Sequence, residues 1–169
     1  GEDFEWFYAQ HNVSILDNGD IALFDNGTAK VKRVDADNRV SGDDVYSRAV
    51  VYHIDTENMT VSQVTEYGKE RGADWYADWI SGVVSLDGTQ DHLWITAGSH
   101  LHNDEENRSD YYPKDMFVPG LTKTTHIDQV DNGELSFELT ISGDTYNALT
   151  FRSFRMPLYT EGKNDVSAV

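Results

Sequence analysis

A repeated pattern of short, β-rich hairpins is the feature that most limits what this chain can fold into. Tyr52-His53-Ile54-Asp55 leads through a polar turn into a second β-rich run, and Thr125-His126-Ile127-Asp128 does the same, with the two histidines 73 positions apart. A weaker echo at a similar offset relates Val13–Phe24 to Val83–Ile95. Self-similarity at a fixed period is typical of repeat proteins, and four short antiparallel strands per unit is how a propeller blade is built. The repeat predicts an all-β fold in which His53 superposes on His126.

The strands themselves are visible as alternating or β-rich runs. Residues 46–55 alternate as a half-buried strand must, and residues 59–67 follow closely enough to form an antiparallel hairpin with them. Asn18-Gly19 marks another hairpin, because it tolerates the positive φ of a tight turn. We expect blade-like units at about residues 12–67 and 80–142, a partial unit at 146–159 and a flexible tail at 161–169.

Segments that lack a β pattern are expected to connect these strands. Residues 68–74 predict a turn between the two strand systems, and residues 28–44 and 98–119 predict long polar loops. The whole chain then corresponds to a propeller fragment of about two four-stranded blades plus part of a third. No run of residues predicts a helix.

Composition excludes several classes of function. Thirty acidic residues against thirteen Lys and Arg give a formal charge of −17, which repels phosphate backbones and argues against a nucleic-acid partner. No apolar run approaches the roughly 20 residues of a membrane-spanning helix. With no cysteine in the sequence, disulfides, thiolate metal sites and cysteine nucleophiles are excluded. The chain opens on Gly1 without an initiator methionine, so we expect it to be part of a longer protein.

The histidines are the best candidates for chemistry among the remaining side chains. His53, His92 and His126 lie in or beside predicted strands and are interpreted as framework or surface residues. His11 precedes the first hairpin, and His100 and His102 follow a predicted strand end, where loops of a propeller gather over the central channel. Surface positions in an acidic loop remain an alternative for His100 and His102.

A metal site is a competing interpretation of the same segment. His100 and His102 are followed by three acidic residues that offer ligands, but the spacings of zinc sites are missing. The acidic turns at 17–20 and 131–134 lack the twelve-residue ligand pattern of calcium loops, and hairpin-turn chemistry explains them. We therefore expect neither a metal nor a cofactor.

Several motifs together resemble the bacterial arylsulfotransferases, the aryl-sulfate sulfotransferases that use no nucleotide sulfate donor. The motifs are Gln10-His11, Leu23-Phe24-Asp25-Asn26-Gly27, Tyr46-Ser47-Arg48-Ala49-Val50 and, most specifically, Glu66-Tyr67-Gly68-Lys69-Glu70-Arg71-Gly72. The similarity is strongest from His11 to Leu101 and looser beyond it. The resemblance implies a six-bladed β-propeller, a phenolic sulfate donor and a phenol acceptor, and an extracytoplasmic location.

The resemblance also implies roles for particular residues. A channel histidine that is transiently sulfurylated falls on His100, within Gly98-Ser99-His100-Leu101, with His102 as the alternative register. A second channel histidine falls on His11. The family's basic residue after Asn-Gly, usually arginine, falls near Lys30, and lysine lacks the planar fork that grips an oxyanion at two points.

These residue types suit sulfuryl transfer. A neutral imidazole can attack sulfur while Lys30, Arg48 or a second imidazole stabilises the developing charge and protonates the leaving phenolate. Because the family's earlier blades supply a further histidine that this sequence does not contain, we expect residues 1–169 to be inactive alone. Uncovered blade faces predict self-association. The alternative function is a non-catalytic β-repeat module that binds a carbohydrate or a protein through its Trp and Tyr residues.

Overall fold

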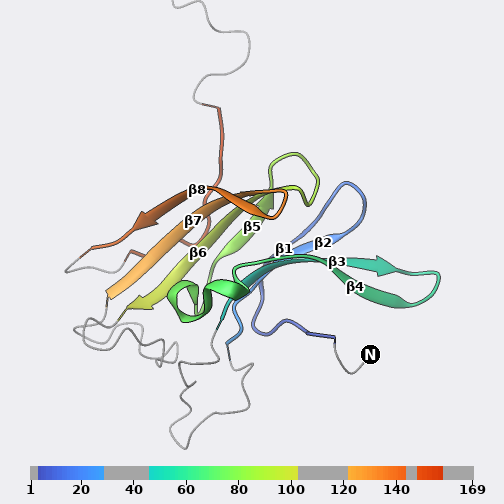
Figure 1. Ribbon diagram of the computed structural model, residues 1–169, viewed down its shortest axis with the longest axis horizontal. Helices are drawn as coiled ribbons and strands as arrows, with labels where there is room; N and C mark the ends of the chain where they lie inside the picture. Colours follow the sequence, from blue (N-terminus) through green and yellow to red (C-terminus); the bar gives the residue numbers. More distant parts are fainter. Residues whose placement is uncertain (1–3, 29–45, 103–121, 144–147, 158–169) are drawn as a thin grey trace, which may run out of the picture.

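Two four-stranded antiparallel sheets make up the fold (Figure 1). The computed structural model describes residues 4–28, 46–102, 122–143 and 148–157. The first sheet contains β1 (His11–Ile15), β2 (Ile21–Asp25), β3 (Arg48–Asp55) and β4 (Thr60–Tyr67) in that order. The second contains β5 (Gly82–Ser85), β6 (His92–His102), β7 (Thr122–Asp131) and β8 (Glu134–Ile141). The prediction of an all-β fold with two four-stranded antiparallel units is confirmed.

The two sheets pack face to face through one apolar core. Phe24 and Val51 of the first sheet and Leu93 and Ile95 of the second belong to a single buried cluster. Trp75, from the segment between the sheets, is fully buried in this cluster and packs its ring against Phe24 and Tyr67 at centroid distances of 5.6 and 5.5 Å. Large aromatic side chains contribute most to such a core, because each removes about 150–250 Å² from water.

The connection between the sheets differs from the predicted turn. Residues Lys69–Trp75 form a 3-10 segment (η2) that is kinked at Gly72. Gly68 allows this segment to begin, since its φ is +101° and a Cβ there would lie 2.2 Å from the Trp75 ring. Within the described residues no helix is long and apolar enough to cross a membrane.

The outer face of the first sheet is covered by the N-terminal segment. Leu23, Val50 and Tyr52 are buried on this face, and Phe4 and Phe7 pack against them. The rings of Phe4 and Phe7 lie 5.6 and 6.0 Å from the Tyr52 ring. The aromatic start of the chain therefore packs on the face of the first sheet that lies opposite the shared core.

Strand register corrects the predicted superposition of His53 on His126. Both residues lie in the third strand of their sheets, but the β2–β3 ladder pairs Ile21 with Tyr52 while the β6–β7 ladder pairs Leu93 with Val130. Both first hairpins close with equivalent hydrogen bonds, from Leu16 N to Asp20 O and from Leu86 N to His92 O, each 2.8 Å. Counting from these closures aligns His126 with Arg48.

The physical reason is the length of the outer hairpins. β3 continues beyond Tyr52, the partner of the first residue of β2, so that the β3–β4 hairpin extends past β2, as Figure 1 shows. In contrast, β7 stays paired with β6 to its last residue, Asp131. The match between His-Ile-Asp at residues 53–55 and at residues 126–128 therefore misaligned the two strands. The register aligns His53 with Asp131 instead.

The segment that leaves the second sheet repeats the way the chain leaves the first. Ser47 Oγ donates to the carbonyl of Ala77 at 3.2 Å, and Thr125 Oγ1 donates to the carbonyl of Ala148 at 2.9 Å. Ser47 and Thr125 each directly precede the residues that the register aligns, Arg48 and His126. Residues 148–157 then run along the second sheet, with Ser153 Oγ 2.9 Å from Trp94 Nε1.

Candidate active site

His11 is held by an amide whose orientation decides its tautomer. His11 Nδ1 lies 2.6 Å from Asn26 Oδ1. Asn26 Nδ2 donates to the carbonyls of Ala77 and Ile80 at 2.7 and 3.0 Å, so the amide oxygen must face the imidazole. An amide oxygen only accepts hydrogen bonds, and His11 therefore carries its proton on Nδ1. Nε2 is left to accept a proton when the ring is neutral and to donate one when it is charged.

His100 and His102 lie within β6 rather than in the predicted loop. The strand continues because it stays paired with β7, where His100 faces Thr124 and His102 faces Thr122 in the ladder. Between Ala97 and His100 the register shifts, so that Gly98 and Ser99 together oppose one residue of β7. This β-bulge fixes the register of both histidines, and bulges of this kind are common next to active sites.

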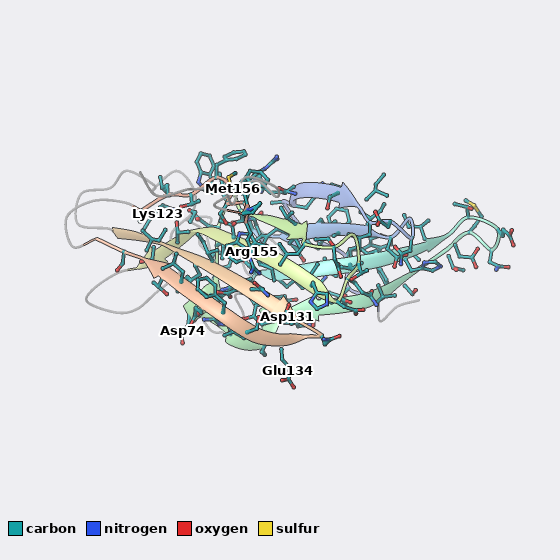
Figure 2. The ribbon with its side chains drawn as sticks, turned by 90° about the horizontal axis from the view of Figure 1, so that it is seen from above. Asp74, Lys123, Asp131, Glu134, Arg155 and Met156 are labelled. Carbon is teal, nitrogen blue, oxygen red and sulfur yellow. The ribbon has the colours of Figure 1, made fainter. Side chains whose placement is uncertain are left out.

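The bulge and His11 lie at the same end of the two sheets. The hairpin closures described above align Asn26, the partner of His11, with Gly98 of the bulge. Lys123, at the start of β7, marks this end, and Asp131 lies at the other end of the strand (Figure 2). The fold therefore brings together the two chain segments that carry the predicted channel histidines.

Arg48 is fully buried and its guanidinium is surrounded by protein acceptors. Nε donates to Asp25 at 3.0 Å, and Nη1 donates to Glu5 at 3.0 Å and also contacts Glu66. Burial lowers the pKa of Arg48, but its hydrogen bonds to Glu66 and Asp25 outweigh that effect and raise the pKa above its ordinary value. Further acceptors are the Gln63 side chain, the Tyr52 hydroxyl and the carbonyl of Glu5. These contacts make Arg48 an anchor between the sheet and the N-terminal segment.

The sequence motif with the strongest family resemblance joins the two sheets. Tyr67 donates to Asp128 on β7 at 3.1 Å, and Arg71 pairs with the same carboxylate at 2.8 Å. Burial is the main cause that raises the pKa of Asp128 to about 6. Asp128 was not singled out from the sequence. No local pattern distinguishes an aspartate that becomes buried between two sheets from any other aspartate in a strand.

The metal alternative finds no support among the residues that the structure describes. In those ranges no group of three or more His, Cys, Asp or Glu side chains is placed to hold a metal ion. Residues 104–106, the acidic part of that alternative, lie outside the described residues, as does Lys30. The acidic turn at 17–20 is stabilised internally, since Asn18 Nδ2 donates to Asp20 at 2.8 Å.

Successive four-stranded antiparallel sheets, packed face to face and joined by equivalent linkers, define blades of a β-propeller. The family model described as "Arylsulfotransferase (ASST)" matches residues 1–152. The chain belongs to the arylsulfotransferase family.

Two curated relatives show the extent of the similarity. The protein named "Arylsulfate sulfotransferase AssT" from Escherichia coli O6:H1 is 31% identical over 152 residues, which is 89% of this chain and 22% of the relative. The protein of the same name from Lelliottia amnigena is 36% identical over 97 residues, 57% of this chain and 15% of the relative. The matched region thus spans about a fifth or less of the length of these relatives.

Proposed function

We propose that this chain carries part of the active site of an enzyme that moves a sulfuryl group from a phenolic sulfate to a phenol, with His100 as the sulfurylated residue. Family membership supports the reaction class. The observation that carries the site is that one linker connects the partner of His11 with the backbone that precedes His100, because Asn26 bonds to Ile80 and Ser81 bonds to Gly98.

The proposed reaction has two balanced steps. In the first, an imidazole nitrogen of His100 attacks sulfur, the sulfur–oxygen bond to the aryl group breaks, and the leaving phenolate takes a proton from Nε2 of charged His11. In the second, the acceptor phenol loses its proton to His11 Nε2 while its oxygen attacks sulfur and the nitrogen–sulfur bond breaks. His102 is the alternative nucleophile.

Charge on the transferred group requires a cation, and we propose Lys30, which lies outside the described residues, for this role. Arg48 supports the site indirectly, because its guanidinium is occupied by Asp25, Glu5 and Glu66. We further propose that residues 1–169 alone do not complete the site, and that the enzyme acts outside the cytoplasm.

Covalent labelling tests this function directly. The full natural reading frame that encodes this chain is exposed briefly to 4-nitrophenyl sulfate, quenched and analysed by peptide mass spectrometry. A sulfuryl adduct on His100 that disappears when a phenol is added is the expected result. An adduct on His102 alone would correct the register, and turnover without any histidine adduct would overturn the mechanism. No turnover together with binding of a carbohydrate or a protein would favour the β-repeat binding module.

A further inference from the structure

The linker between the two sheets contacts the supports of both candidate catalytic histidines. On one side, the carbonyls of Ala77 and Ile80 accept from Asn26 Nδ2, and Asn26 Oδ1 accepts from His11. On the other side, Ser81 Oγ accepts from the Gly98 N–H at 3.0 Å, within the β6 bulge. A segment of five residues, 77–81, thus connects two strands of different blades.

A buried ion pair fixes the second bulge residue to the same linker. Ser99 Oγ donates to Asp78 Oδ1 at 2.7 Å. Lys123 Nζ lies 3.1 and 3.3 Å from the two Asp78 oxygens and 2.9 Å from Ser99 Oγ. All three side chains are buried, at 1% relative exposure or less. An ammonium has three protons, so the three contacts satisfy it completely.

Burying such a cluster contributes little net stability, which points to a role in fixing the geometry of its neighbours. Taking a carboxylate and an ammonium out of water costs several kcal/mol per ion, and apolar side chains of similar volume are often as stable. Burial lowers the pKa of Lys123, because removal from water disfavours the charged ammonium. Here the ion pair orients Ser99, the residue directly before His100.

The linker backbone is itself strained. Ile80 and Ser81 have φ values of 51° and 91°, a region that β-branched and other non-glycine residues rarely adopt. Conformations of this kind cost about 1–3 kcal/mol each and persist only where surrounding contacts impose them. Gly98 is tightly enclosed as well, since a Cβ there would lie 1.8 Å from the Thr150 carbonyl oxygen.

We propose that Asn26, Asp78, Ser81 and Ser99 are positioning residues, which use the linker 77–81 to hold His11 and the β6 bulge before His100 at a fixed separation for sulfuryl transfer. The proposal rests on the function proposed above. Misplacing a reacting group by about 1 Å can cost about a hundredfold in rate. Removing one contact should therefore slow transfer while leaving donor binding intact.

Ser99→Ala tests the proposal in the full natural reading frame, with Ser85→Ala as the matched control. Ser85 also donates a hydroxyl hydrogen bond, to the carbonyl of Thr89 at 2.7 Å, but in an exposed hairpin at the other end of β5. Ser99→Ala is expected to lower the single-turnover rate of His100 sulfurylation about tenfold to a hundredfold with an unchanged KM for donor. Ser85→Ala is expected to change neither.

Hydrogen exchange supplies a second readout that does not depend on catalysis. Amides of the bulge at 98–100 should exchange faster in Ser99→Ala than in the wild type, and at the wild-type rate in Ser85→Ala. A wild-type rate of sulfurylation and unchanged exchange in Ser99→Ala would overturn the positioning role. Faster exchange with unchanged transfer would reduce Ser99 to a structural residue. If the wild type forms no histidine adduct, the proposed function fails, and exchange alone decides whether the linker holds the bulge.

Discussion

His53 and Asp131 occupy the same position in their two sheets, and each is one half of a histidine–aspartate pair. In the first sheet Nδ1 of His53 lies 2.7 Å from Asp20, and in the second Nδ1 of His92 lies 2.8 Å from Asp131. The register that aligns His53 with Asp131 also aligns Asp20 with His92. The two blades therefore make the same cross-strand histidine–aspartate hydrogen bond with the partners exchanged.

The exchanged pair predicts a pH-dependent contribution to stability. The hydrogen bond to Asp131 raises the pKa of His92 above 6.5, and it lowers the pKa of Asp131 to about 2. A histidine whose pKa rises on folding stabilises the fold below its unfolded pKa, and this contribution is lost as pH rises through the folded value. The melting-temperature difference between wild type and His92→Gln should be larger at about pH 5 than at about pH 9.

A swapped double variant provides the control for that pair. His92→Asp combined with Asp131→His copies the arrangement of the first sheet and should recover most of the melting temperature lost in either single variant. An equal loss at both pH values would show that the pair contributes by packing alone.

Asp128 predicts a second loss of stability with rising pH, at lower pH values. Its pKa of about 6 lies above the ordinary 3.8, so its ionised form is disfavoured in the fold and its contribution to stability is lost as pH rises through about 6. Two pKa units correspond to about 3 kcal/mol. Asp128→Asn removes this titration, although it weakens the pairing with Arg71. The unfolding free energy of the variant relative to wild type, from urea titrations, should therefore rise between about pH 4 and about pH 7. A flat difference would contradict the buried, disfavoured carboxylate.

The two channel histidines predict different kinetic defects. His100→Ala should abolish turnover of an aryl sulfate, because no neighbouring group replaces the covalent intermediate. His11→Ala should slow turnover about 10²- to 10⁴-fold, the usual contribution of a general acid or base. His53→Ala is the control, since that histidine lies in the β3–β4 hairpin, and its turnover should equal that of the wild type. Unimpaired turnover in His11→Ala would remove it from the mechanism.

The exposed face of β8 predicts self-association of residues 1–169. Alternate residues of this strand are apolar and 39–45% exposed: Leu135, Phe137, Leu139 and Ile141. A row of apolar side chains on a sheet's outermost strand is a ready surface for association. Sedimentation velocity should show oligomers that Leu135→Glu with Leu139→Glu dissociates. Met59→Glu, at an 86% exposed site in the β3–β4 turn, should leave them unchanged. A stable wild-type monomer would refute the prediction.

The sequence determined most of the strands, the hairpins between them and the family, because these depend on local signals. Alternation shows the strand at residues 46–55, although β3 is buried on both faces over its first five residues. Asn18-Gly19 shows a tight hairpin, and Glu66–Gly72 is a contiguous string. Each signal needs only neighbours in the chain, since side-chain alternation and turn conformation are properties of a few successive residues.

Only the tertiary structure decided which residues of the two repeats are equivalent and what surrounds the candidate site. His53 and His126 are the same residue type, and each lies in the third strand of its sheet. The register of those strands is nevertheless fixed by hydrogen bonds to β2 and β6 and by hairpin length. The cluster of Asp78, Ser99 and Lys123 joins residues up to 45 positions apart. Such contacts form because a buried charge must find a partner, and which partner lies within reach depends on how the blades pack rather than on the residues beside it.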